Sequence, residues 1–199
     1  MKRHLVLITA AVALVTLLAT GCAPDEQAAL TVNGTEVLTV GELQDQLDQI
    51  AEDDDFLTSS DGRGEGAGTL SAGFVAAVLS NHVLNALVAE DLAAEGIEVT
   101  EADITEGTEL LAQQVGGDVE VIPSDYRELL VELFGGFIAL SGSLDDDQAA
   151  AQERANALLA EADVEVARRY GRWDAESAEV APPEGPVTPT TAPVVLPGG

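Results

Sequence analysis

The chain has 199 residues, of which 36 are acidic and only 8 are lysine or arginine, so its formal net charge is −28. A chain this acidic repels nucleic acid and anionic headgroups, which makes both poor partner predictions. Its length is sufficient for one domain with a hydrophobic core.

The N-terminus has the pattern of an export signal. Lys2 and Arg3 precede an apolar run over residues 5–18. This run of about 14 residues is too short to span a membrane but has the size of a signal-peptide core. Small residues then lead to Cys22, the single cysteine of the chain (Leu18-Ala19-Thr20-Gly21-Cys22).

This arrangement resembles the bacterial lipobox. The resemblance implies that residues 1–21 are a lipoprotein signal peptide and that Cys22 becomes the acylated first residue of the mature form, carrying chains such as palmitate. The alternative is an ordinary secreted protein with an incidental cysteine. Two acyl chains on one residue give stable anchoring. We therefore expect the protein at the extracytoplasmic face of the bacterial cell membrane, with residues 22–28 as a tether.

A β-hairpin and a helix are predicted next. Leu30 and Val32 alternate with polar residues, and Asn33-Gly34 is a tight-turn dipeptide before a second strand at Val37. Thr39 and Glu42 match a helix capping box, and the helix should end within the acidic run 52–55. The glycine-rich segment 58–69 is predicted to be a flexible loop, since it lacks the ligand spacing of a calcium or phosphate loop.

Four helical segments and a strand follow. Residues 71–95 are apolar over a wide arc, which indicates a central helix ending at Gly96. Further helices are expected over 100–115, 123–138 and 147–162, the second interrupted by Gly135-Gly136, followed by a strand at 164–166. Residues 175–199 are predicted to be a disordered tail, because the chain from Pro182 onward is rich in Pro, Thr, Val and Gly without a core pattern.

Three segments in this order resemble the SurA-like family, which includes the PrsA foldase lipoproteins and trigger-factor-related chaperones. They are Val32-Asn33-Gly34 with Glu42-Leu43, the segment from Ala89 through Gly96-Ile97 to Asp103-Ile104, and Val164-Glu165-Val166 with Arg169-Tyr170-Gly171-Arg172-Trp173-Asp174. The resemblance implies a mainly α domain over residues 29–174, closed by a small antiparallel sheet that pairs the N- and C-terminal strands. It also implies chaperone activity. The family's parvulin isomerase domain has no counterpart here, so prolyl isomerase activity is not expected.

The residues themselves predict no catalytic, metal or cofactor site. His82 is the single histidine after the signal segment and is interpreted as a packed helix residue. No Gly-x-Ser-x-Gly nucleophile motif occurs, and the clusters 53–55 and 145–147 are interpreted as solvated helix ends. Arg168, Arg169 and Arg172 either pair with the acidic surface of the same domain, the favoured interpretation, or bind an anionic partner.

The leading hypothesis is a lipid-anchored chaperone or holdase that binds unfolded or exported polypeptides without catalysis. Its client site would be an apolar concavity between helices, with the stripe Tyr126–Ile138 and the central helix as candidate walls. The favoured interpretation of these same side chains is that they form the core. The alternative is a non-enzymatic scaffold or adaptor in the cell envelope that binds one folded partner.

Overall fold

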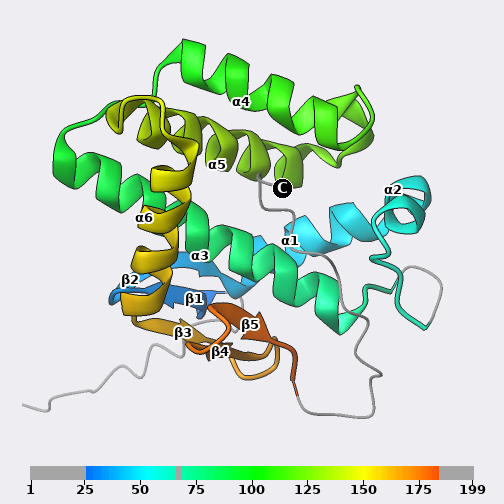
Figure 1. The fold of residues 1–199 in the computed structure, drawn as a ribbon. Coiled ribbons are helices and arrows are strands. Elements are labelled where there is room, and N and C mark those ends of the chain that lie inside the picture. Colours follow the sequence, from blue (N-terminus) through cyan, green and yellow to red (C-terminus); the bar gives the residue numbers. More distant parts are fainter. Residues whose placement is uncertain (1–25, 66–68, 184–199) are drawn as a thin grey trace, which may run out of the picture.

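The computed structural model describes residues 26–65 and 69–183 (Figure 1). The predicted signal peptide, Cys22 and the tail beyond residue 183 lie outside these ranges. Of the described residues 61% are helical, which confirms the predicted mainly α fold with a small antiparallel sheet. The elements in chain order are β1 (Ala28–Val32), β2 (Thr35–Thr39), α1 (Val40–Ala51), α2 (Asp54–Ser59), α3 (Ala72–Glu95), α4 (Glu101–Gln114), the 3-10 helix η2 (Val119–Val121), α5 (Ser124–Ser143), α6 (Gln148–Glu161), β3 (Val164–Val166), β4 (Arg172–Asp174) and β5 (Glu179–Ala181).

The main sheet joins the two ends of the domain. Its strand order is β2-β1-β3, and both pairings are antiparallel, with Leu30 opposite Val166. Asn33 and Gly34 connect β1 to β2 with φ angles of 50° and 77°. Positive φ at both central residues matches the twist of a hairpin, which explains the Asn-Gly dipeptide. The predicted closure of the sheet by the strand at 164–166 is confirmed.

Local capping signals place the helix ends. The Thr39 hydroxyl accepts from the Glu42 backbone, and the Glu42 carboxylate accepts from the Thr39 backbone and hydroxyl. These two hydrogen bonds to Thr39 lower the pKa of Glu42. Thr100 and Asp103 form the same capping box at the start of α4. Gly96 ends α3 in the left-handed region, at φ 71°. Glycine adopts this conformation without a steric penalty because it has no side chain.

Helix α3 is the central element. It lies between the α4–α5 pair on one side and the strands on the other, while α6 crosses it (Figure 1). Buried apolar residues occur all around it, among them Val78, Leu84 and Leu92. By length and hydropathy α3 could also cross a membrane, but half of its apolar window is buried inside the domain. The packing of α3 on several sides accounts for its composition.

Three predictions about local structure differ from what is observed. Asp53 caps a short helix, α2, that the sequence pattern did not indicate. Helix α5 continues without interruption through Gly135-Gly136. The ordered chain also continues past Asp174, where the tail was expected to begin. There β5 pairs with β4, and Val180 is only 4% exposed.

Candidate functional site

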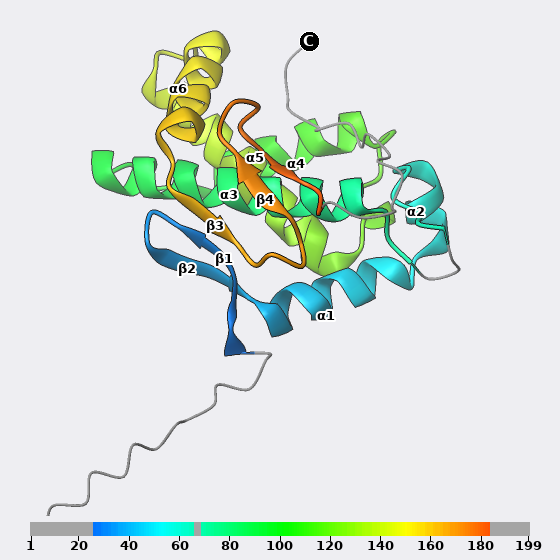
Figure 2. The ribbon, with the colours of Figure 1, turned by 90° about the horizontal axis from the view of Figure 1, so that it is seen from below.

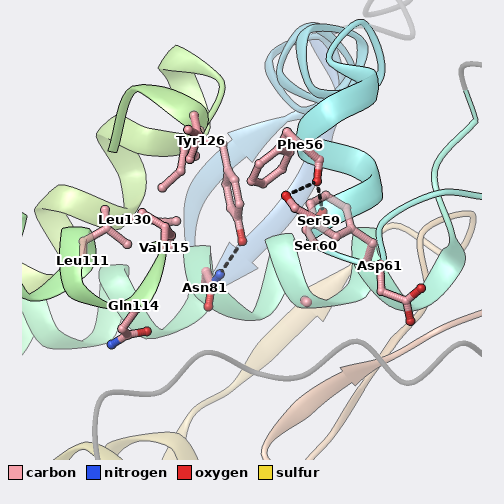
Figure 3. Close-up of a pocket in the computed structure, with 14 residues that line it drawn as sticks. Phe56, Ser59, Ser60, Asp61, Asn81, Leu111, Gln114, Val115, Tyr126 and Leu130 are labelled. Carbon is pink, nitrogen blue, oxygen red and sulfur yellow. Dashed lines mark hydrogen bonds between the residues drawn. The ribbon is translucent and has the colours of Figure 1, made fainter. Parts of the chain in front are cut away.

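An open pocket of about 400 Å³ lies between α2, α3, α4, η2 and α5 (Figure 3). Its walls are mostly apolar. Helix α4 contributes Leu111 and its C-cap residue Val115, and α5 contributes Tyr126 and Leu130. The remaining lining residues are Phe56, Ser59, Ser60, Asp61, Phe74, Ala77, Asn81, Gln114, Val121 and Ile122.

Three aromatic rings form one wall of the pocket. The rings of Phe56, Phe74 and Tyr126 contact one another edge to face, with centroid distances of 5.9 to 6.1 Å. They come from α2, α3 and α5, so the cluster also holds these three helices together. Such edge-to-face pairs are favoured by the charge distribution of the rings and add to the burial energy. The wall is therefore rigid and apolar.

A hydrogen bond between two lining side chains connects α3 to α5. The Asn81 side-chain amide donates a hydrogen bond of 2.9 Å to the Tyr126 hydroxyl, and Figure 3 shows the two groups pointing toward each other. Burial raises the pKa of Tyr126 to about 12, so the hydroxyl keeps its proton at neutral pH. Since the oxygen accepts from Asn81, the hydroxyl hydrogen stays available to a ligand.

The mouth of the pocket is polar except for Val121. Ser59, Ser60, Asp61 and Gln114 lie around it, and Figure 3 shows the Asp61 carboxylate pointing away from the aromatic rings. Val121 is 46% exposed, which makes it one of two large apolar residues with a high exposed fraction in the described chain. The other, Val99, does not line the pocket. This combination suits an apolar group entering from water.

His82 lies elsewhere, in a hollow lined by polar and apolar residues of β2, α1, α3 and α5. Its Nε2 is 2.9 Å from the side-chain oxygen of Gln46. Burial lowers the pKa of His82 to about 4, and the Glu42 carboxylate opposes this shift only weakly. Within the described ranges no three His, Cys, Asp or Glu side chains gather closely enough to hold a metal ion.

The arginines fall into two groups. Arg63, Arg127 and Arg154 form ion pairs with Asp54, Glu120 and Asp91 respectively. The Arg154–Asp91 pair is bidentate and connects α6 to α3. Arg168, Arg169 and Arg172 are exposed, and none of them forms an ion pair with another described residue. The favoured interpretation, that these three pair with the domain's own acidic surface, therefore has no ion pair among the described residues to support it.

The predicted client-binding walls are partly those of the pocket. Tyr126 and Leu130 of the stripe line it, as do Phe74 and Asn81 of the central helix, and each of the four is at most 7% exposed. Leu133, Phe134 and Phe137 of the stripe are buried in the same core. Sequence reasoning missed Phe56, because α2 was not expected. The signal available for it was Asp53, a helix N-cap residue three positions before an aromatic residue.

A scan against family models, a search of curated proteins and a search of solved structures each found no match for this chain. The resemblance to the SurA-like family thus stays a prediction from the sequence motifs.

Proposed function

We propose that this protein is a lipid-anchored extracytoplasmic holdase, which binds apolar side chains of unfolded or exported polypeptides without catalysis. The observation that carries the proposal is the open pocket, with its aromatic wall and the exposed Val121 at its mouth. An exposed apolar residue beside an apolar hollow is typical of a binding surface.

The volume of the pocket supports a small occupant. A volume of about 400 Å³ lies near the lower end of the range of roughly 300–1,000 Å³ typical of ligand sites. It accommodates one or two large side chains of an extended client rather than a folded surface. The Tyr126 hydroxyl can donate a hydrogen bond to the backbone of such a client. The hydroxyls of Ser59 and Ser60 already donate to the Phe56 carbonyl, and they can accept from a client amide.

The acidic surface supports the same role. A net charge of −28 keeps copies of the protein apart while the pocket is open to solvent. The same charge favours clients with basic residues beside their apolar ones. The anchor predicted at Cys22 would hold the pocket close to the membrane surface from which exported chains emerge.

The matched pair Val121 and Val99 gives the test. We expect the mature protein to reduce light scattering from an aggregating unfolded client, and Val121→Asp to lose most of this effect. The reason is that a carboxylate at the pocket mouth has to be desolvated when an apolar side chain enters. Val99→Asp makes the same change at a position of similar exposure, 42% against 46%, and should behave as wild type.

Two outcomes contradict the proposal. One is that aggregation of the client is unchanged at several-fold excess of the protein, and the other is that both aspartate variants act alike. Crosslinking in membranes separates the alternative function. A single dominant folded partner, captured equally by wild type and Val121→Asp, would support the scaffold or adaptor.

A further inference from the structure

Three of the six arginines that follow the signal segment lie within five residues, from the end of β3 to the first residue of β4. We call Arg168, Arg169 and Arg172 the arginine patch. All three are exposed, and the carboxylates that flank them in the sequence, Glu165 and Asp174, form no ion pair with them. In a chain with 36 acidic residues, an exposed and unpaired group of arginines is unusual, because partners are abundant.

The arginine patch lies beside the start of the described chain. The Ala167 backbone donates a hydrogen bond of 2.9 Å to the Ala29 carbonyl, so Arg168 follows directly on a residue bound to β1. Figure 2 shows the segment that leaves β3 running next to β1. From Ala29 back to Cys22 is a stretch of seven residues, which reaches at most about 25 Å. An acylated Cys22 would therefore keep the patch near the lipid surface.

Two aromatic residues of the same segment fit this location. The Arg169 guanidinium lies 4.8 Å from the centre of the Tyr170 ring, and Trp173 follows Arg172 in β4. Both rings are partly buried, and the indole Nε1 of Trp173 is buried without a hydrogen-bond partner among the described residues. Arginine, tyrosine and tryptophan are the side chains that favour the boundary between water and lipid.

We propose that the arginine patch binds the anionic headgroups of the membrane that holds the Cys22 anchor, and so fixes how the domain is oriented. This inference depends on the anchor of the proposed function. At physiological ionic strength charges act over about 8 Å, so the contact depends on the arginine patch and on the nearby carboxylates, such as Glu165 and Asp174, rather than on the net charge of the whole chain. The acidic faces are repelled and turn away from the lipid.

This orientation has a consequence for the pocket. Helices α4 and α5, which form one wall of the pocket, lie on the opposite side of α3 from the strands (Figure 1). A domain that rests on the β3–β4 segment directs this wall away from the lipid. Anionic headgroups, which are poor partners for the net charge of the whole chain, are suitable partners for the arginine patch.

Trp173 is the single tryptophan and serves as the probe. The lipidated protein is reconstituted into vesicles with a nitroxide on the headgroup of a phosphatidylcholine, with or without added phosphatidylglycerol. We expect stronger quenching of Trp173 fluorescence on the anionic vesicles. This excess should be lost at 1 M salt, where charges act over only about 3 Å.

The matched variants are R168Q/R169Q in the patch and R63Q/R127Q elsewhere, each of which removes two charges. The first should lose the excess quenching and the second should keep it. Equal quenching on zwitterionic and anionic vesicles, or equal behaviour of the two variants, would overturn the proposal. These results are also the ones expected if the arginine patch binds an acidic protein instead of lipid headgroups.

The anchor is tested separately, by flotation of the protein with the vesicles. If the natural protein does not float, the proposed acylation of Cys22 is contradicted. The orientation of the domain is then tested in a second experiment. There the unlipidated mature chain is coupled through the Cys22 thiol to a maleimide lipid, and the same quenching comparison is made. Loss of the anionic excess in this coupled form overturns the role of the arginine patch, whatever the state of the natural anchor.

Discussion

His82 is held uncharged in the folded domain. Burial lowers its pKa to about 4, from the 6.5 of a free histidine. As the pH falls below 6.5, the unfolded chain binds a proton before the folded chain does. The contribution of neutral His82 to the free energy of unfolding is therefore complete above pH 6.5 and is lost as the pH falls toward 4.

We therefore expect acid to destabilise wild type more than His82→Gln. The relative loss in the free energy of unfolding should approach about 3 kcal/mol between pH 6.5 and 4, with solvent contact of the ring reducing this figure. Urea titrations at several pH values give the difference between the two proteins, in which the effects of the carboxylates cancel. Parallel pH profiles would show that His82 titrates normally in the folded state.

Single residues also show where sequence reasoning ends. Asn33 was predicted from the tight turn, and its φ of 50° agrees. Its side chain also donates to Glu90 on α3, at 2.9 Å, and accepts from the Asp163 backbone, at 3.1 Å. These partners are 57 and 130 residues away in the chain. A tight turn depends on neighbouring residues and can be predicted from the sequence, whereas these long-range contacts form only when the helices have packed.

At the scale of elements, glycines set the distance between α4 and α5. A Cβ on Gly107 of α4 would lie 2.5 Å from the Gly135 nitrogen and 2.8 Å from the Phe134 carbonyl carbon. Backbone atoms of a helix cannot move aside independently. Gly135 was expected to interrupt its helix, but it instead allows this close crossing. The sequence pattern shows the glycine pair and not the helix that approaches it.

Gly107→Ala should consequently move α4 away from α5. We expect a loss of about 1–3 kcal/mol in the free energy of unfolding, the usual effect of overpacking. Because Leu111 on α4 and its C-cap residue Val115 line the pocket, client binding should weaken as well. Gly142→Ala is the control, since a Cβ there meets nothing within 4 Å and alanine favours the helix. A Gly107→Ala protein as stable as wild type would show that the two helices can separate freely.

The elements were predicted correctly where the sequence has a local capping signal or a long apolar pattern. The capping box at Thr39 and the Gly96 terminus are confirmed, as is the central helix. The prediction failed for α2, which has six residues, and for the β4–β5 hairpin, which has three residues in each strand. Segments this short carry too few apolar positions for a period, and they are ordered by the surfaces on which they pack.

At the scale of the whole molecule, both ends of the described chain pack on α3. Strand β1 lies near the start of the described chain and β5 lies near its end, and both strands contact α3. The backbone amide of Val180 in β5 donates a hydrogen bond of 2.9 Å to the Ser80 hydroxyl, which is buried on α3. The hairpin thus covers part of the helix on which the sheet and the pocket helices also rest.

A chain ending after Asp174 should therefore be less stable than one ending after Pro183. Val180 is 4% exposed, and losing the burial of one valine costs roughly 1.5–3 kcal/mol. The uncovered Ser80 hydroxyl regains water, which offsets part of the effect, whereas Trp173 loses its partner strand. For a domain of this size we expect the thermal midpoint to fall by several degrees, at roughly 2–4 °C per kcal/mol.

The longer truncation retains every contact of β5 and is the matched control. Because α3 also carries Phe74 and Asn81, the shorter chain should lose holdase activity at a lower temperature. Equal thermal midpoints for the two chains would mean that β5 does not stabilise α3.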